Sequence, residues 1–339
     1  MIENRKEDHI RIAENEVVTS SHNYWDDVHI LHQAIPEVDF SSIDASTKFI
    51  DHKIQYPMII SSMTGGVALG KKINKNLAAA AEKFQIPMGV GSMRAAVEKR
   101  ELSDTFSVIL EHKIPVRIAN IGAPQLINQD KPAFKDADIE FVMNLIDANY
   151  LIVHFNFLQE MVQPEGDRNA KGVMRRLREI AGSYPVIAKE TGNGFSRDAA
   201  LELKDAGVRA IDVGGLGGTT FAKMKSGESF WNWGIPAPAS IKYCQVGLPV
   251  IGSGGLRNGL DLAKALMFGA VAGGFARNLL AHADQSPEKV IQEVAFILRD
   301  LKIAMFLTRS ESLADLRQAR FFVTSPLKEW LEAYDRGKE

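Results

Sequence analysis

The sequence predicts an α/β fold, a TIM (β/α)8 barrel with N- and C-terminal extensions, on three observations. The chain has 339 residues, of which 45% are hydrophobic and 24% charged, a composition that supports a large buried core. Eight short apolar runs recur along it, each followed by a loop that is polar or contains glycine. A stretch with helical spacing follows most of these loops, and strands that alternate with helices pair in parallel.

The eight apolar runs have the length and composition of buried strands. Their starts are 28, 29, 35, 36, 24, 39 and 21 residues apart, and one strand with its crossover helix needs roughly 30 residues. The predicted strands span residues 58–61, 86–90, 115–119, 150–155, 186–189, 210–213, 249–251 and 270–275. The predicted helices between them span residues 71–83, 137–148, 171–181, 197–206, 237–245 and 260–267.

Both ends of the chain extend beyond the predicted barrel, which spans residues 56–281. Residues 1–55 form an N-terminal extension of helical or mixed character, and residues 282–339 form C-terminal helices. One of these, at 288–308, is long and amphipathic and could cap the ring of strands. No linker rich in Pro, Gly or Ser divides the sequence, so we expect residues 1–339 to form a single domain.

The alternative fold, an open doubly wound sheet with a dinucleotide site, is tested by the spacing of the glycines. Its fingerprint G-x-G-x-x-G requires a third glycine three residues after the second. At three glycine pairs with the right spacing, Arg94, Arg197 or Arg257 occupies the third position. The sequence also has no G-x-x-x-x-G-K-[ST] phosphate loop, so the barrel remains the prediction.

Charge and cysteine content exclude several classes of partner. With 40 Lys and Arg residues against 42 Asp and Glu residues, the net charge is −2, which favours neither a nucleic acid nor a membrane surface as partner. The lone Cys244 cannot form an intrachain disulfide. The charged N-terminus lacks the apolar core of a signal peptide, and no stretch approaches the ~20 apolar residues of a membrane span. We therefore expect a cytoplasmic protein.

Glycine clusters at the ends of the last predicted strands indicate an anion site. The strand-seven loop reads GSGGLR (252–257) and the strand-eight end reads GFAR (274–277). Glycines let backbone N–H groups approach an anion, and a helix N-terminus favours negative charge. This is the usual phosphate position of such barrels, and the loop GGLGGTT (214–220) adds Thr219 and Thr220 as hydroxyl donors. Tight turns without any ligand are the alternative.

Lys189 ends the predicted fifth strand. A lysine there can form a Schiff base, balance the charge of a cofactor, or be an ion-paired bystander. Asn120, Ser92 and Thr64 end other strands and could hydrogen-bond the edge of a planar heterocycle. A phosphate site with a ring of amide, hydroxyl and lysine groups is the arrangement that flavin mononucleotide (FMN) requires, because its tail is anionic and its ring edge needs both donors and acceptors.

The densest polar cluster follows the fourth predicted strand, in the segment HFNFLQE. It contains His154, Asn156, Gln159 and Glu160. Mg²⁺ typically takes one or two carboxylates plus phosphate oxygens of the substrate, and Glu160 is placed for that role. The alternative is an acid that only stabilises a helix N-terminus.

The N-terminal arm carries Arg5, Lys6 and His9. These side chains could clamp a diphosphate if the arm folds over the barrel mouth. A charged terminus exposed to solvent is the alternative.

Eight sequence blocks, taken together, resemble the type 2 isopentenyl-diphosphate isomerases, a flavin-dependent family of isoprenoid synthesis. In chain order the blocks are RKEDHI, SMTGG, GSMR, ANIGAPQ, VHFNFLQE with QPEGD, AKETGNG, GGLGGTT and GSGGLR. The match runs from Arg5 to the strand-eight loop, which is nearly the whole chain. One block alone would be weak, whereas eight in register are specific.

The resemblance implies which residues serve which ligand. It implies that FMN is held by Ser62, Met63, Thr64, Ser92, Asn120, Lys189, Thr219, Gly255, Leu256, Arg257, Ala276 and Arg277. It also implies that Glu160 holds Mg²⁺ and that the diphosphate substrate contacts Arg5, Lys6 and Gln159, with His154 and Asn156 close by. His9 of the same arm joins the predicted substrate-binding residues, and the predicted catalytic residues are Gln159, His154 and Lys189.

The activity that the resemblance implies is the conversion of isopentenyl diphosphate to dimethylallyl diphosphate, a shift of one double bond without net redox change. No residue of the sequence is an obvious strong acid for an unactivated alkene. The family resemblance implies that reduced FMN serves as acid and base after reduction by NAD(P)H. Lys189 would then stabilise negative charge on the flavin, Mg²⁺ on Glu160 would neutralise the diphosphate, and Gln159 would orient the substrate.

Two other functions are compatible with a barrel of this kind. A flavin α-hydroxyacid oxidase or dehydrogenase would need a histidine base and arginines for the substrate carboxylate. The strand-six loop at 214–220 has no histidine, and His154 is the only one in the strand-end loops. A non-catalytic phosphate-binding barrel would not need so crowded a polar mouth. The helical C-terminus leads us to expect a homo-oligomer.

Overall fold

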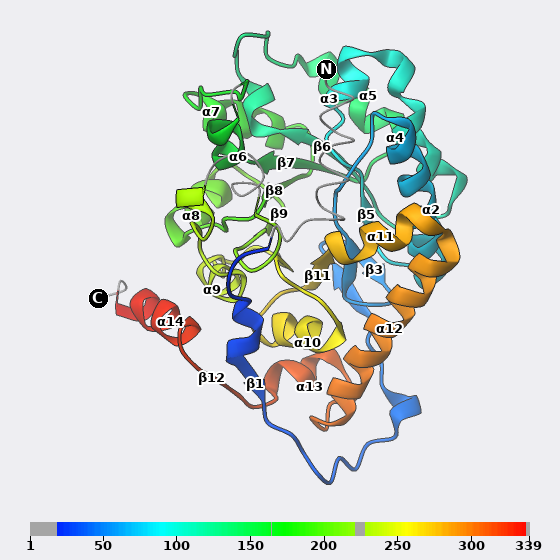
Figure 1. Ribbon diagram of the computed structural model, residues 1–339, viewed down its shortest axis with the longest axis vertical. Coiled ribbons are helices and arrows are strands. Elements are labelled where there is room, and N and C mark those ends of the chain that lie inside the picture. The colour runs from blue at the N-terminus through cyan, green and yellow to red at the C-terminus, as the bar shows by residue number, and fades with distance from the viewer. Residues whose placement is uncertain (1–18, 164, 221–227, 337–339) are drawn as a thin grey trace.

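Eight parallel strands close into a barrel at the centre of the chain, in a computed structural model that describes residues 19–163, 165–220 and 228–336 (Figure 1). The strands follow one another around the barrel in chain order, and the last of them pairs with the first. They are β4 (Met58–Ile60), β5 (Met88–Gly89), β6 (Arg117–Gly122), β7 (Tyr150–Phe155), β8 (Val186–Glu190), β9 (Ala210–Asp212), β10 (Val250–Ser253) and β11 (Ala272–Phe275). The predicted barrel is confirmed.

Helices surround the barrel and begin at residues suited to that position. Side chains of Ser196, Asn258 and Ser286 cap the N-termini of α8, α10 and α12 by accepting backbone N–H groups. The helices are α2 (Ala68–Phe84), α3 (Arg94–Glu98), α4 (Asp104–Ser107), α5 (Asp136–Leu145), α6 (Phe157–Val162), α7 (Val173–Ala181), α8 (Arg197–Asp205), α9 (Ala237–Tyr243), α10 (Gly259–Met267), α11 (Arg277–Gln285), α12 (Pro287–Phe306), α13 (Leu313–Gln318) and α14 (Leu327–Arg336). Short 3-10 turns include η1 (Tyr24–Asp27) and η5 (Ala123–Leu126).

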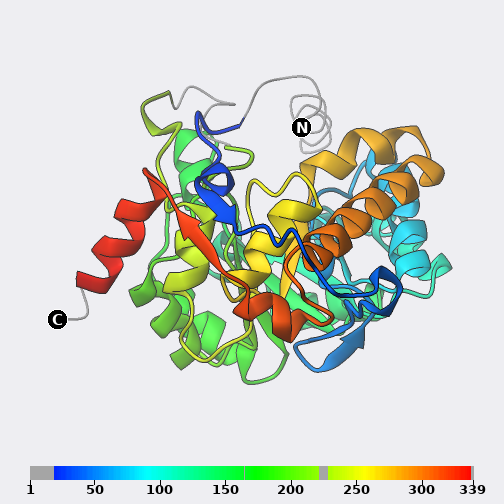
Figure 2. The same cartoon turned by 90° about the horizontal axis from the view of Figure 1, so that it is seen from below.

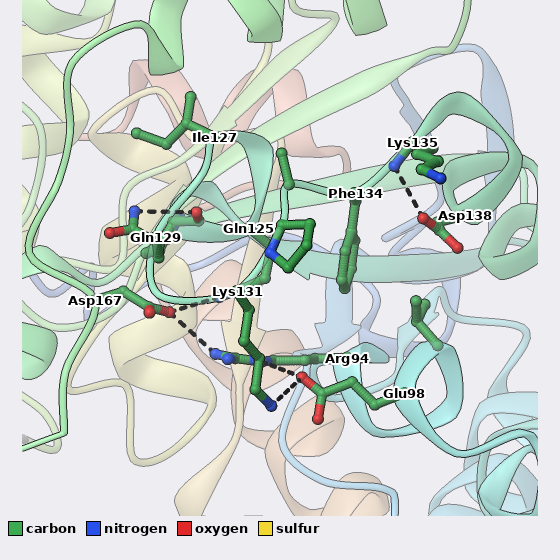
Figure 3. A pocket seen from close by; sticks show the side chains of 14 residues that line it. Arg94, Glu98, Gln125, Ile127, Gln129, Lys131, Phe134, Lys135, Asp138 and Asp167 are labelled. Atoms are coloured by element: carbon green, nitrogen blue, oxygen red, sulfur yellow. Dashed lines mark hydrogen bonds and ion pairs between the residues drawn. The ribbon is translucent and has the colours of Figure 1, made fainter.

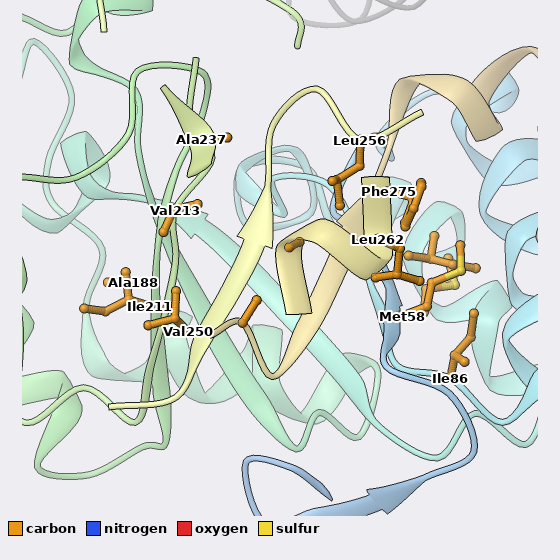
Figure 4. Packing of buried hydrophobic residues seen from close by; sticks show 14 of the residues in the cluster. Met58, Ile86, Ala188, Ile211, Val213, Ala237, Val250, Leu256, Leu262 and Phe275 are labelled. Carbon is orange, nitrogen blue, oxygen red and sulfur yellow. The ribbon is translucent and has the colours of Figure 1, made fainter. Parts of the chain in front are cut away.

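Successive side chains of a barrel strand point to opposite faces. One face is buried against the surrounding helices and the other inside the barrel. The outward residues, such as Ile211, Val250 and Phe275, pack against the surrounding helices (Figure 4). The inward residues form a separate apolar cluster that fills the lower part of the barrel, and Ile118, Ile152 and Ile187 belong to it. The inward positions beyond this cluster are therefore those that reach the barrel mouth.

A hairpin of the N-terminal extension closes the opposite end of the barrel. Its strands β2 (Thr47–Phe49) and β3 (His52–Ile54) pair antiparallel. Phe49 is fully buried among the inward residues, and its ring meets that of Tyr150 edge-on at 6.2 Å. Because this end is plugged, the site can only be at the other end.

The two ends of the chain meet beside the barrel. Strand β1 (Val28–Ile30) pairs antiparallel with β12 (Phe321–Val323), as Figure 2 shows. The predicted long helix at 288–308 is present as α12, but it packs against α2 and α10 on the outside of the barrel and does not cap the ring of strands. The expectation that residues 282–339 are helical is thus incomplete, because β12 needs a strand partner 291 to 295 residues earlier in the chain, and no local sequence pattern indicates it. In the described part of the chain, every helix is too short or too polar to cross a bilayer.

Candidate active site at the barrel mouth

A ring of polar side chains lies directly above the inward apolar cluster. Asn120, His154, Lys189, Asp212 and Ser253 each follow an apolar inward residue by two positions, so all point into the same end of the barrel. The Asn120 Oδ1 atom lies 2.7 Å from His154 Nδ1. The ring is made by five neighbouring strands, β6 to β10.

Asn120 differs from its predicted position. It was expected just after a strand at 115–119, but β6 runs from Arg117 to Gly122 and contains it. The side chain is buried, at 4% exposure. The strand continues past its apolar part because an amide pointing into the polar mouth finds a partner in His154.

Lys189 forms a buried ion pair at the centre of the ring. Its Nζ atom lies 3.0 Å from Asp212 Oδ2, and the side chains are 11% and 1% exposed. Ser253 Oγ donates to Asp212 Oδ1 and accepts from Lys189 Nζ at 3.4 Å and from the Gly214 N–H at 3.0 Å. Asp212 was not predicted. It lies two residues beyond Ala210 on the inward face and directly opposite Lys189 in the β8–β9 register, which the sequence alone does not give.

The two loops in which a phosphate site is predicted lie against each other at the mouth. Gly255 has a φ of +77°, and a Cβ atom there would lie 2.6 Å from the Gly217 carbonyl oxygen. A Cβ at Gly218 would lie 2.6 Å from the Gly255 nitrogen. The loops after β9 and β10 therefore approach backbone to backbone, and only glycine permits this.

The remaining predicted phosphate contacts are close to this pair of loops in the chain. Ala276 is the N-cap of α11 and supplies no side-chain cap, so the helix N-terminus depends on other acceptors. Leu256 is buried and Thr219 is partly exposed. Burial lowers the pKa of Arg277, the first residue of α11.

The side chain of Arg257 is directed to two acids. Its guanidinium contacts Asp26 at 2.5 Å and Asp261 at 2.8 Å. The hydrogen bond to Asp261, followed in strength of effect by the one to Asp26, raises the pKa of Arg257 above its usual value. The guanidinium joins η1 of the N-terminal extension to the β10 loop, and contact of Arg257 with FMN stays a prediction.

The same stretch of the N-terminal extension holds the glycine loops from outside. Trp25 Nε1 donates to the Gly254 carbonyl at 2.8 Å, and Asn23 Nδ2 donates to the Gly255 carbonyl at 2.9 Å. Lys264 Nζ donates to the Trp25 carbonyl at 2.7 Å. Sequence reasoning did not identify these contacts, since they join residues more than 200 positions apart.

Four predicted FMN residues follow β4 and β5. Thr64 is buried, and its carbonyl accepts the Gly91 N–H at 2.8 Å. Met63 and Ser92 are partly buried. The hydroxyl of Ser62 is buried and has no hydrogen-bond partner among the described residues.

Three residues of the fourth-strand cluster, Asn156, Gln159 and Glu160, contact one another, whereas His154 is hydrogen-bonded to Asn120. Glu160 is 5% exposed, and its Oε1 accepts from Asn156 Nδ2 at 2.8 Å while its Oε2 accepts the Asp167 N–H at 3.1 Å. Asn156 Nδ2 also lies 3.4 Å from Gln159 Oε1. These contacts fix the Glu160 carboxylate at the start of α6.

A cavity of about 250 Å³ adjoins this cluster outside the barrel (Figure 3). On its wall, Arg94 bridges Glu98 at 2.9 Å and Asp167 at 3.0 Å. Gln125 Nε2 donates to the same Asp167 carboxylate at 3.3 Å. The backbone of Asp167 holds Glu160, so the cavity wall supports the predicted metal ligand.

The residues present fit a magnesium ion shared with a substrate. Buried Asn156 Oδ1 has no hydrogen-bond partner in the described part of the chain and lies beside Glu160. Oxygen atoms of this kind are the ligands that Mg²⁺ prefers. No group of three or more His, Cys, Asp or Glu side chains suited to a metal occurs at 19–163, 165–220 and 228–336. Phosphate oxygens and water would have to complete the coordination.

The residues present also fit FMN. The glycine loops bring their backbones closer together than a Cβ atom would allow, and backbone N–H groups in such loops can bind a phosphate. The Ser62 hydroxyl is buried without a hydrogen-bond partner at 19–163, 165–220 or 228–336, and Lys189 supplies a cation to the ring of polar side chains. The predicted contacts Arg5, Lys6 and His9 lie outside the described residues.

Glu190 organises the loop after Lys189 from the outward face of β8. Its Oε2 accepts backbone N–H groups of four successive residues, at 2.7 Å from Thr191, 2.8 Å from Gly192 and 3.1 Å from Gly194, with Asn193 as the fourth. Burial raises the pKa of Glu190 to about 7, although these four N–H groups favour the charged form.

We predict that Glu190 makes stability depend on pH. Its pKa is higher in the folded chain than the ordinary 4.5, so the folded state binds more protons between pH 4.5 and 7. The free energy of unfolding should therefore fall by about 3 kcal/mol as pH rises through this window. Urea unfolding at several pH values should show a flatter profile for Glu190→Gln. The exposed variant Glu179→Gln should keep the wild-type profile, and an unchanged slope in Glu190→Gln would contradict the assignment.

Comparisons with known proteins agree with this geometry. The model of the FMN-dependent dehydrogenase family matches residues 6–107 and 154–322. An isopentenyl-diphosphate delta-isomerase of Picrophilus torridus is 62% identical, with 98% of this chain and 100% of that protein covered. The Thermoplasma volcanium protein of the same name is 58% identical with the same coverage.

Solved structures share the fold at low sequence identity. The flavin-binding domain of baker's yeast flavocytochrome b2 is 16% identical, with a TM-score of 0.69 over 96% of this chain and 83% of that one. A mandelate oxidase variant is also 16% identical, with a TM-score of 0.62 over 94% and 98%. At this identity the likeness concerns the barrel alone.

Proposed function

The chain belongs to the FMN-dependent dehydrogenase family and, within it, to the isopentenyl-diphosphate delta-isomerases, and from this we propose that it converts isopentenyl diphosphate to dimethylallyl diphosphate with FMN. The observation that carries the proposal is the identity of 62% and 58% over essentially full length. The polar ring, the glycine loops and the Glu160 cluster support it, because each is suited to one part of the cofactor or substrate.

FMN, when bound and reduced by NAD(P)H, would supply the proton donor and acceptor that the protein lacks. Lys189 would place a positive charge beside the flavin ring, and Asn120 and Ser62 would offer hydrogen bonds to the same ring. The glycine loops, with Thr219 and the start of α11, would bind its phosphate. These residues orient the cofactor and balance its charge.

The substrate diphosphate would be held from the other side of the mouth. Glu160 and Asn156 would carry Mg²⁺, which neutralises the diphosphate. Gln159 and His154 would orient the allylic carbons, and the N-terminal arm would complete the clamp with cationic side chains.

The ring of polar side chains at the barrel mouth disfavours the α-hydroxyacid oxidase alternative. Such an enzyme needs a histidine base close to the reacting carbon. The inward residue at the end of β9 is Asp212, and the loop that follows it contains glycine and threonine instead. His154 is hydrogen-bonded to Asn120. It belongs to β7, which lies on the other side of Lys189 from Asp212.

Isotope incorporation tests the proposal directly. The protein is incubated without oxygen with FMN, NADPH, Mg²⁺ and isopentenyl diphosphate in deuterated water. Deuterium in dimethylallyl diphosphate is the expected result, with NADPH consumed only once per flavin. Absence of product together with flavin reduction by an α-hydroxyacid would favour the oxidase, and a protein without FMN affinity would overturn both. Light scattering of the same sample tests the expected homo-oligomer.

A further inference from the structure

Asp212 is the most deeply buried charge at the barrel mouth. It is 1% exposed and lies directly opposite Lys189 in the register of β8 and β9. One carboxylate oxygen meets Lys189 Nζ at 3.0 Å, and the other accepts the hydroxyl of Ser253. Its carboxylate oxygens therefore have only these two partners among the interactions described, and both belong to the ring.

The ion pair is costly as a purely structural feature. Removing two charges from water costs several kcal/mol per ion, and a pair of apolar residues in their place is often equally stable. The surrounding barrel interior offers such apolar residues, with Ile187 and Ala210 one layer below. A charged pair at this one level points to a use at the mouth, where Lys189 is predicted to lie beside the flavin ring.

The geometry of Ser253 shows how the carboxylate is fixed. The hydroxyl donates to Asp212 and accepts both Lys189 Nζ and the Gly214 N–H. Gly214 begins the loop that leads to the predicted phosphate contacts. The three side chains therefore connect the cation of β8 to the β9 loop through two neighbouring strands.

We propose that Asp212 is a positioning residue for Lys189, and that its charge sets how strongly the site prefers reduced over oxidised FMN. A cation beside the ring favours the reduced, more negative cofactor. A carboxylate 3.0 Å from that cation opposes this preference and holds the ammonium in one place. The inference rests on the proposed function only in that FMN must bind.

The test is the reduction potential of bound FMN, measured with a reference dye and dithionite, without any diphosphate substrate. Asp212→Asn keeps the shape of the side chain but removes its negative charge. The affinity of this variant for reduced FMN, relative to its affinity for oxidised FMN, should therefore rise at least tenfold. This corresponds to a potential about 30 mV higher for a two-electron couple. Lys189→Gln should shift the potential in the opposite direction.

The double variant Lys189→Gln/Asp212→Asn separates electrostatics from folding. It lacks both charges, so its potential should return toward the wild-type value. Its ratio of dissociation constants for oxidised and reduced FMN should then lie within threefold of the wild-type ratio. Asp51→Asn, which loses a charge at the plugged end of the barrel beside Arg209, is the matched control and should not change the potential. An unchanged potential in Asp212→Asn, or a double variant as displaced as Lys189→Gln, would overturn the inference. Since isomerisation is not measured, failure of the proposed activity is recognised separately.

Discussion

Glu160→Gln is expected to lose the Mg²⁺ dependence of the isomerase and about 10²- to 10³-fold of its turnover. A bound metal supplies several kcal/mol of charge stabilisation, and each 1.4 kcal/mol corresponds to a factor of ten in rate. The buried carboxylate beside the unpartnered Asn156 oxygen is the centre of the proposed metal site. Steady-state rates over a series of Mg²⁺ concentrations measure the effect.

The fold of this variant must be checked, because a Gln side chain has one oxygen that accepts hydrogen bonds where the Glu160 carboxylate has two. Glu160 accepts from Asn156 and from the Asp167 N–H, so a Gln amide group would face one of these donors at a cost of about 1–3 kcal/mol. Thermal unfolding reports this loss independently of catalysis. Glu202→Gln, on the exposed side of α8, should retain full activity. A folded Glu160→Gln enzyme with normal Mg²⁺ dependence would remove Glu160 from the metal site.

Gly255→Ala is expected to weaken FMN binding by about 10²-fold or more. The new Cβ would lie 2.6 Å from the Gly217 carbonyl at a φ of +77°, so one of the two loops must move away. Each charge-assisted hydrogen bond to phosphate that this movement breaks is worth about 1.5–3 kcal/mol. Titration of the apoprotein, followed by quenching of flavin fluorescence, measures the affinity.

Gly247→Ala is the matched control for backbone strain. Gly247 has a φ of +90°, but its nearest contact would be Lys204 Nζ at 3.5 Å. This variant has the same left-handed strain of about 1–2 kcal/mol without the collision. Equal loss of FMN affinity in both variants would show that the close approach of the loops is irrelevant to the phosphate.

The barrel could be predicted because its eight strands are apolar on both faces. Runs such as YLIVHF and VIAK stand out from the polar loops on either side, and their spacing accommodates one helix each. The end of β6 was harder to place, since a polar Asn120 inside a strand resembles a loop residue until the mouth that receives it is known.

Pairing across strands limited the prediction of the site. Lys189 was identified as a strand-end cation, but its partner Asp212 was hidden inside the apolar run AIDV. The partners of Arg257 show a stronger limit, because Asp26 lies 231 positions away. Local patterns identify chemically useful residues, whereas the contacts that neutralise or orient them follow from closure of the barrel.

The end of β8 has a consequence for how the chain assembles. Lys189 points inward and the next residue, Glu190, points outward, so adjacent positions carry opposite charges on opposite faces. A shift of β8 by one residue during folding would exchange them. Two carboxylates, those of Glu190 and Asp212, would then face each other in a dry interior, and the lysine would enter the apolar layer under the helices. The alternation of charge at this strand end therefore favours the observed register of β8 over one shifted by a single residue.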